Sequence, residues 1–252
     1  MTPPRRPLIF DVETIADLTP ETRDTVAALA AGREMTPEAY GGLCPPLARV
    51  VCIGWLDAAQ QALGTFLDAT LCPVTPPASV AVEHGAAAAP VSRDCAMIAC
   101  NGEAEVLRQF GRMVDAHCRS AGGQLVTYSG RGFDLPVLIH RAIKHQVTEG
   151  RELLIRAATE NRYRPVLHLD LVDAVTFFGA ANRWPLAAYA VGYGCRSPKT
   201  DMDGSQVWAA VQAGRLVDVA RYCAGDVLAT AHIHRCLQSP APLPSAAAPV
   251  ER

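Results

Sequence analysis

Hydrophobic runs of strand length occur at the start of the chain and return in its middle. Residues 8–14, 49–56 and 62–68 are rich in apolar and β-branched side chains, and polar segments separate them. This pattern is typical of antiparallel strands that follow one another across a sheet. Residues 122–129 and 165–171 predict a fourth and a fifth strand.

Apolar residues at helical spacing surround the two later strands. A helix is expected from Asn101, which would cap it, with a buried face made of Val106, Leu107, Phe110, Met113, Val114 and His117. Further helical patterns cover residues 133–145, residues 151–160 and a long segment from Leu216 to Leu237. Strands and helices in this order predict an α/β fold, a mixed five-stranded sheet flanked by helices.

Two segments lack this periodicity. Residues 72–100 are rich in Ala, Pro and Val, and we expect them to form a flexible, extended insertion on the surface. The Pro- and Ala-rich end of the chain, residues 239–252, cannot pack a core and is expected to be a disordered tail. We expect residues 1–238 to form a single domain.

The composition indicates a globular protein, because half of the 252 residues are hydrophobic, which is ample for a packed core. The formal net charge of −2 gives no basic field, so a polyanionic partner would need local basic residues or bound cations. The nine cysteines form neither a CxxC pair nor a zinc-ligand spacing, which favours a reducing, cytoplasmic location. The apolar stretch after Arg6 ends at Asp11, too short for a signal peptide or a membrane span.

A pair of acids lies inside the first predicted strand, in the stretch LIFDVETIAD. Side chains alternate along a strand, so Asp11 and Glu13 share one face with Ile9, while Phe10 and Val12 lie on the other. Two like charges on a half-buried surface repel each other, and a cation or a shared proton usually compensates them. The stretch alone favours a metal site and the polar face of an edge strand about equally.

Two further acids and a tyrosine are placed where they could join this pair. Asp134 follows a strand and a Gly-containing turn, where it would cap the next helix or face the crevice at the strand end. Tyr222 and Asp226 lie four residues apart, about 6 Å along one face of the last helix. Asp226 is at the margin of that helix's apolar stripe, where a carboxylate needs a partner.

Together these segments resemble the 3′–5′ exonucleases with a four-acid DEDD site and a tyrosine in the third motif, on a ribonuclease-H-like fold. In particular they resemble the bacterial group of predicted exonucleases related to the exonuclease domain of family B DNA polymerases. The motifs that carry the resemblance are FDVET, SGRGFDLPVL and YCAGD, and HLDL and MDGSQVW are also similar to this group. The resemblance extends from Leu8 to Leu237 and omits only the insertion and the tail.

The resemblance implies a metal-dependent 3′–5′ exonuclease that acts on the 3′ end of nucleic acid, with single-stranded DNA favoured. It implies two Mg²⁺ or Mn²⁺ ions, which suit hard carboxylate ligands without His or Cys. Asp11 would bind both ions, while Glu13 and Asp226 would complete the first site. Asp134 would hold the second ion, partly through water. Tyr222 would orient the attacking water, because a phenol is a poor general base at neutral pH but a good hydrogen-bond partner.

The second motif departs from the family at Ser129, where an asparagine is usual. Serine keeps only a hydroxyl, so a contact to the substrate could be weaker or mediated by water. Arg131 in the same loop could contact phosphate, although a solvated arginine is slightly favoured. His168 and Asp170 share a strand face. They would either support the site residues from behind or form a hydrogen-bonded polar pair at the strand end.

Three other features are interpreted as structural. Asp203 and Gln206 have the spacing of a helix capping box. Trp208 is expected to pack in the core rather than stack on a base. His232 and His234 lie two apart on a helix and cannot face one metal together.

Two other functions stay open at this point. One is an exoribonuclease acting on RNA 3′ ends, and the other is an inactive nucleic-acid- or protein-binding module on the same fold. The presence of all four acids and the tyrosine argues against the inactive module. Nothing in the sequence separates DNA from RNA, because recognition of the 2′-hydroxyl depends on loop geometry. No membrane partner is expected.

Overall fold

A seven-stranded sheet forms the centre of the protein, which we describe from a computed structural model that places residues 5–86, 89–120, 122–198 and 202–239. The strands are β1 (Arg6–Ala16), β2 (Ala48–Asp57), β3 (Ala62–Asp68), β4 (Ser79–Ala86), β5 (Ala89–Cys100), β6 (Gly123–Thr127) and β7 (His168–Asp170). Their order across the sheet is β4-β5-β3-β2-β1-β6-β7. β1 is antiparallel to β2 and parallel to β6, so the sheet is mixed and β1 is an interior strand.

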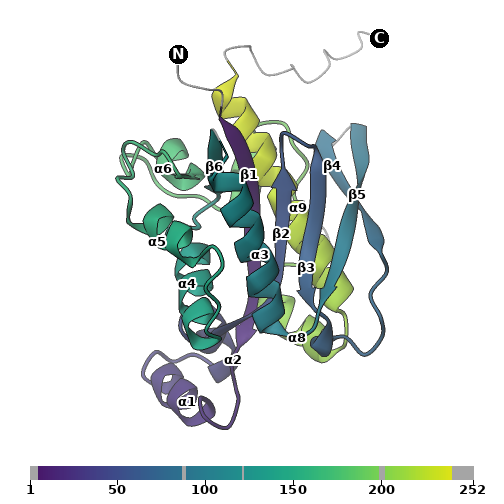
Figure 1. Cartoon of the computed structure of the whole chain (residues 1–252), viewed down its shortest axis with the longest axis vertical. Coiled ribbons are helices and arrows are strands. Elements are labelled where there is room, and N and C mark those ends of the chain that lie inside the picture. The colour runs from purple at the N-terminus through teal and green to yellow at the C-terminus, as the bar shows by residue number, and fades with distance from the viewer. Residues whose placement is uncertain (1–4, 87–88, 121, 199–201, 240–252) are drawn as a thin grey trace, which may run out of the picture.

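Helices cover both faces of this sheet. They are α1 (Arg23–Ala31), α2 (Pro37–Leu43), α3 (Glu103–Cys118), α4 (Asp134–Lys144), α5 (Arg151–Thr159), α6 (Leu171–Val175), α7 (Leu186–Gly192), α8 (Val207–Gln212) and α9 (Leu216–Gln238), with short 3₁₀ turns at Ala69–Leu71 and Gly204–Gln206. Figure 1 shows α3 on one side of the strands and α9 on the other. The prediction of an α/β fold with helices flanking a mixed sheet is confirmed.

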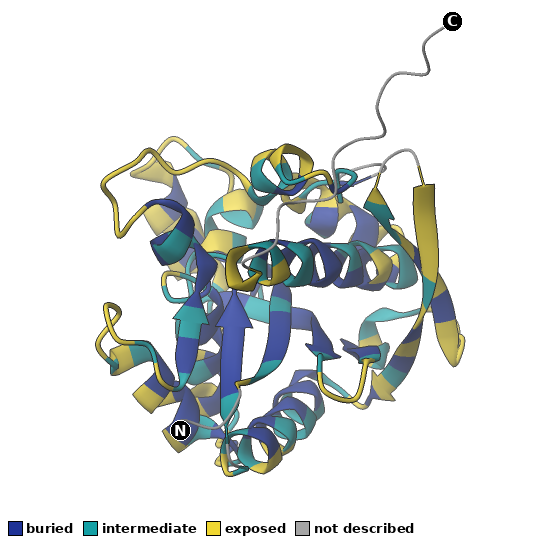
Figure 2. Cartoon of the chain, turned by 90° about the horizontal axis from the view of Figure 1, so that it is seen from above, coloured by how far each residue is buried: buried dark blue, intermediate teal, exposed yellow. Residues whose placement is uncertain are grey.

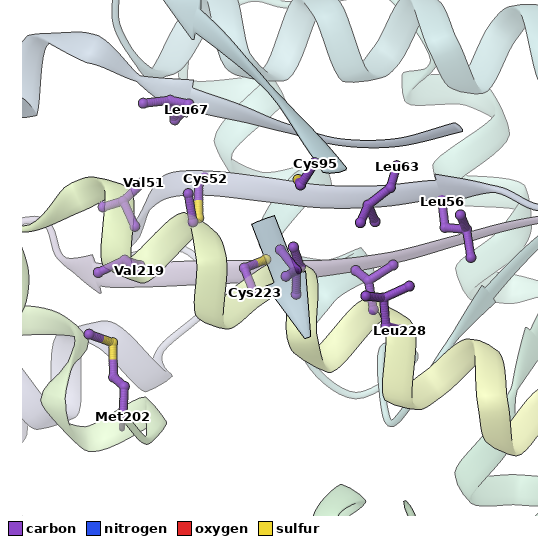
Figure 3. Packing of buried hydrophobic residues seen from close by; sticks show 14 of the residues in the cluster. Val51, Cys52, Leu56, Leu63, Leu67, Cys95, Met202, Val219, Cys223 and Leu228 are labelled. Carbon is purple, nitrogen blue, oxygen red and sulfur yellow. The ribbon is translucent and has the colours of Figure 1, made fainter. Parts of the chain in front are cut away.

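The alternation in β1 divides the core into two halves. Phe10 and Val12 pack in the half that contains α3 and α4, whereas Ile9 and Ile15 pack in the half that contains α9. Figure 3 shows the second half, where side chains of α9 such as Val219 lie against those of the strands. The acids between these apolar residues therefore lie on the face that α9 covers, as the predicted alternation requires.

The sheet is larger than predicted, because residues 72–100 do not form an irregular insertion. Most of them form β4 and β5, which pair with each other and join β3 through β5. The inward-facing residues Val80, Val82, Cys95 and Met97 are buried at a period of two, and exposed residues alternate with them. Figure 2 shows that exposed residues are frequent in these outer strands, while the central strands are buried.

The predicted helix after β5 is confirmed, but its start differs. α3 begins at Glu103, and its N-cap residue is Gly102, with a φ of +94°, rather than Asn101. The side chain of Glu103 explains this start, because it is buried and accepts a hydrogen bond from the amide of Val50 (2.8 Å). The predicted disordered tail, residues 239–252, lies outside the described residues apart from Ser239.

A buried ionic network ties β1 to two helices. Arg141 of α4 is 1% exposed and bonds Asp17, just after β1, at 2.8 Å and Glu103 of α3 at 2.6 Å. Lys144 also pairs with Asp17. Burial raises the pKa of Asp17 and of Glu103, but hydrogen bonds from their basic partners outweigh it, so both pKa values are lowered. Both acids are therefore ionised at neutral pH, and the network fixes α4 relative to β1.

None of the helices in the described part of the chain has the length and apolar character needed to cross a bilayer. All nine cysteines lie in that part, and each has a free thiol.

Candidate active site

β1 places Asp11 and Glu13 on the face of the sheet that α9 crosses. Asp11 lies opposite Gly54 of β2, and a Cβ atom on Gly54 would lie 2.9 Å from Sγ of Cys223 in α9. The glycine therefore lets α9 approach the sheet directly beneath Asp11. The register of β1 and β2 shifts after Glu13, so the strand is irregular immediately beyond the acidic pair.

Asp134 comes to the same place from the first turn of α4. It is 5% exposed and is the first residue of α4, whose N-cap is Phe133, so Asp134 is not the N-cap residue. Its carboxylate accepts hydrogen bonds from its own backbone amide and from the backbone of Val12 in β1. Burial, followed by the charge of Asp170, raises the pKa of Asp134 to about 7.

α9 adds Asp226 and Tyr222, one turn apart. Asp226 is 7% exposed and Tyr222 is partly buried. The two side chains are hydrogen-bonded to each other. Burial and the neighbouring charges of Asp226, Glu13 and Asp11 raise the pKa of the Tyr222 hydroxyl, which stays protonated at neutral pH.

The four acids lie close enough to shift one another's ionisation. Burial raises the pKa of Asp11 well above its usual value, and the charges of Asp134 and Asp226 raise it further. The pKa of Glu13 is raised in the same way by burial and then by the other three acids. Glu13 also hydrogen-bonds to Asp11, which two ionised carboxylates cannot do. The structure therefore brings all four predicted acids and Tyr222 together.

Cys223 of α9 is a further neighbour of the site, and the sequence analysis did not single it out. Its Sγ and the carboxylate oxygens of Asp11 and Glu13 lie within 4.8 Å of one another. Burial and the adjacent Cys52 raise the pKa of the Cys223 thiol, so it remains protonated. The thiol is 3.4 Å from the backbone oxygen of Asp11 and 3.2 Å from the amide nitrogen of Gly54. It therefore packs beneath the acids and leaves carboxylates as the charged ligands.

The loop before Asp134 is held by Asp170 at the end of β7. The carboxylate of Asp170 accepts hydrogen bonds from the amides of Ser129 (2.7 Å) and Arg131 (3.0 Å). Ser129 has a φ of +72°, the left-handed region in which Asn is favoured over Ser. The family's usual asparagine therefore suits the backbone at this position. His168 bonds Thr127 at 2.8 Å, so His168 and Asp170 both contact residues that lead into the loop.

The guanidinium of Arg131 contacts protein rather than solvent, so its interpretation as a solvated arginine is wrong. Its Nη1 donates to the carbonyl oxygens of Ala157 (3.2 Å) and Ala158 (3.1 Å) at the end of α5. Its Nε lies 3.7 Å from the carboxylate of Asp173. These contacts fix the loop to α5, and a phosphate contact by Arg131 stays a prediction.

The remaining polar predictions have clear structural outcomes. Asp203 and Gln206 form the predicted capping box. Trp208 packs against the core, as predicted. The Nε2 atom of His232 bonds the carbonyl oxygen of Tyr193 at 2.9 Å.

A cavity of about 640 Å³ lies beside Tyr222, between α9, β4 and the segment before α8. Three arginines line it, and each pairs with an acid of the same cavity. Arg196 pairs with Glu83, while Arg215 and Arg221 bond opposite oxygens of Asp218 at 2.8 Å each. The cavity therefore offers basic side chains next to the tyrosine, with much of their charge compensated.

Comparison with known structures shows the class of fold. The chain is similar to the family B DNA polymerase from the hyperthermophilic archaeon Pyrobaculum calidifontis, with a TM-score of 0.56 and 18% sequence identity. The similarity covers 93% of this chain but only 25% of the polymerase. This likeness shows the fold, which is α/β and ribonuclease-H-like.

Residues 66–238 match the family described as predicted 3′–5′ exonucleases related to the exonuclease domain of PolB. The chain belongs to this family, as its motifs indicated. The matched range contains Asp134, Tyr222 and Asp226, while Asp11 and Glu13 precede it. A search among curated proteins found no match.

Proposed function

We propose that this protein is a metal-dependent 3′–5′ exonuclease that hydrolyses phosphodiester bonds at the 3′ end of single-stranded DNA. The convergence of four acids from β1, α4 and α9 carries the proposal, together with membership of the exonuclease family. Acids that raise one another's pKa in this way are destabilised as neighbours, and divalent cations would relieve the repulsion. The free thiols suit a reducing cytoplasm, where we place the protein.

The donor set fits two Mg²⁺ or Mn²⁺ ions. All four charged groups are carboxylates, the hard oxygen ligands that these ions prefer. Asp11 would contact both ions, Glu13 and Asp226 would hold one, and Asp134 would hold the other. When bound, two divalent ions supply an activated water and stabilise the charge on the leaving oxygen.

Tyr222 would act as a positioning group. Its hydroxyl stays protonated because its pKa is raised, so it does not serve as a base. Its bond to Asp226 fixes the hydroxyl beside the acids, where it can hold the attacking water. The phenol ring is partly exposed and also lines the 640 Å³ cavity, so a strand end could reach it from there.

The same cavity provides the approach of the substrate. Arg215 and Arg221 could exchange Asp218 for phosphate, since a bidentate arginine contact suits either anion. Ser129 and Arg131 lie in the loop that leads to Asp134. We propose that they position the strand through this loop.

The test uses purified protein with single-stranded DNA and RNA of one sequence, each labelled at the 3′ or the 5′ end. With Mn²⁺ or Mg²⁺, a 3′–5′ exonuclease releases a labelled mononucleotide from the 3′-labelled strand and a ladder of shortened strands from the 5′-labelled one. EDTA should stop both reactions. Asp11→Asn should be inactive, whereas Asp94→Asn, at an exposed acid of β5, should retain activity.

Each alternative has its own result. Degradation of RNA but not of DNA would replace the proposed substrate with RNA. Release of the 5′ label first would give the opposite polarity. If neither strand is hydrolysed with either metal, the protein is instead an inactive nucleic-acid- or protein-binding module on this fold.

A further inference from the structure

A second cavity, of about 590 Å³, lies at the end of the sheet where β1 begins. It is bounded by the last turns of α9, the start of β1, the end of β2 and the turn that follows it, and one residue each of β4, β5 and β6. Figure 1 shows the end of α9 beside the beginning of β1 at this place. The lining carries five basic residues: Arg5, Arg93, Arg235, His84 and His234.

The charge of this cavity is not compensated by its own lining. None of the described residues that line it is an aspartate or a glutamate. The three arginines make hydrogen bonds to neutral partners: Arg5 to the backbone oxygen of Val166 (2.9 Å), Arg93 to Oε1 of Gln61 (2.8 Å) and Arg235 to Nδ1 of His232 (3.4 Å). In the 640 Å³ cavity, by contrast, every arginine pairs with a carboxylate.

The basic side chains converge on one region of space. Burial lowers the pKa of His84, and the charges of Arg93 and Arg235 lower it further. A cation strong enough to oppose protonation of a neighbouring imidazole attracts an anion to the same place. Arg93 comes from β5 and Arg235 from the last turn of α9, so these two arginines approach the cavity from different elements.

The cavity also has an apolar floor. Ile9, Leu56 and Leu228 line it and are each at most 5% exposed in the folded chain. Amide side chains of Gln124 and Gln238 lie on the same lining. The lining therefore suits a ligand that combines an anionic group with a flat or apolar body that has polar edges. A cavity of this size is in the range that holds such small molecules.

We propose that this cavity binds a nucleoside monophosphate, with its base on the apolar floor and its phosphate on Arg93 and Arg235. Arginine suits this role because its guanidinium can make two parallel hydrogen bonds to phosphate. The nucleotide would be either free or one unit of a bound strand, since both present the same chemistry.

The cavity lies near the acids, but none of them lines it. Ile9 of its floor and Asp11 are two residues apart on one face of β1, about 7 Å at the rise of a β-strand. Binding here needs neither the metal ions nor the hydrolysis proposed above.

The test is calorimetric titration of the full chain with deoxyadenosine 5′-monophosphate (dAMP) in EDTA at low salt. Inorganic phosphate and deoxyadenosine are titrated separately. We expect dAMP to bind more tightly than either part, because only dAMP uses both the arginines and the floor. Arg93→Gln and Arg235→Gln should each weaken binding by about 10-fold, the loss of one charge-assisted contact. The control is Arg112→Gln, at an exposed arginine of α3.

Three results would overturn the inference: no binding of dAMP, equal binding by the arginine variants and the Arg112→Gln control, or loss of binding in Asp226→Ala instead. A fluorescent single-stranded oligonucleotide, also titrated in EDTA, distinguishes a free nucleotide from one unit of a bound strand. If Arg93→Gln and Arg235→Gln weaken binding of both dAMP and the oligonucleotide, the site holds a unit of a strand. If they weaken binding of dAMP but not of the oligonucleotide, the site holds a free nucleotide. Because no arm measures hydrolysis, a failed nuclease assay does not affect these results.

Discussion

Gly130 allows Asp134 to reach the other acids, and replacing it with alanine is the sharpest test of the site's geometry. A Cβ atom at this position would lie 2.7 Å from Oδ2 of Asp134 and 2.6 Å from Cβ of Thr127. Both separations are well inside van der Waals contact, so one or both groups must move by about 0.5–1 Å. Thr127 has little freedom, because it is fully buried and its hydroxyl bonds both His168 (2.8 Å) and the amide of Gly130 (3.1 Å).

Since Thr127, whose Oγ1 would be the atom nearest to the new Cβ, cannot move away, the loop backbone at Gly130 has to shift. This loop leads to Asp134, so the shift displaces the carboxylate of Asp134. Overpacking of a buried position costs about 1–3 kcal/mol, which should appear as a lower free energy of unfolding in urea. A misplacement of about 1 Å at a reacting centre costs about 100-fold in rate, so hydrolysis of a 3′-labelled strand should fall by that order. Because no ligand is removed, the variant should still require a divalent ion.

Gly132→Ala is the matched control, since it makes the same change two residues later in the same loop. The nearest atom to a Cβ at Gly132 is the backbone oxygen of Ser129, at an ordinary 3.7 Å. Gly132→Ala should keep both stability and hydrolysis close to wild type. If Gly130→Ala behaved like this control, or if both variants lost activity equally, the close packing of Gly130 against Asp134 would not matter for function.

Three further predictions concern other parts of the molecule. Mn²⁺ is expected to raise the melting temperature of wild type. Asp226→Ala removes a proposed ligand and should abolish both this rise and hydrolysis, whereas Tyr222→Phe should keep the rise and lose roughly 100-fold in rate. Equal behaviour of the two variants in a Mn²⁺ titration would contradict the assigned roles. Ser129→Asn should stabilise the fold by up to about 1 kcal/mol, because asparagine tolerates the φ of +72° better than serine does, and a melting temperature below that of wild type would refute this. Arg141→Ala should cost about 3–5 kcal/mol at neutral pH, since it leaves two buried carboxylates without their guanidinium partner. The folded-state pKa values of those carboxylates are lowered, so the stabilisation by the ion pairs is present above their unfolded pKa values and is lost as pH falls through the folded ones. The loss of unfolding free energy caused by Arg141→Ala, measured in urea titrations, should therefore shrink below about pH 4. A loss that stays constant with pH would contradict the ionic explanation.

The hydrophobic pattern of the sequence predicted most of the strands and helices. It failed for residues 72–100, where a high content of Ala and Pro obscured the alternation of a strand. The alternation around Asp11 correctly predicted which apolar residues of β1 share a face. β4 and β5 were missed because prolines and alanines surround their few buried residues, such as Val80 and Met97. Alanine carries little strand signal, so a period of two among so few larger side chains was not recognised.

The acids of the site were predictable from their motifs, but the residues that support them were not. The contact of Cys223 with Asp11 joins residues 212 positions apart and depends on the close approach of α9 to β2. Arg131 was expected in solvent because its loop is rich in glycine, and only the fold shows that the end of α5 meets it. Such contacts depend on tertiary arrangement, which sequence spacing does not encode.

The separation of β1 and α9 along the chain has a consequence for protein synthesis. Asp11 leaves the ribosome 212 residues ahead of its neighbour Cys223, an interval of about 10–40 s at usual rates of translation. During that interval the sheet face that α9 will cover, including Val51 and Leu67, has no partner helix. A nascent or truncated chain therefore lacks Tyr222 and Asp226, and it presents an apolar surface that chaperones would have to shield until α9 has been made.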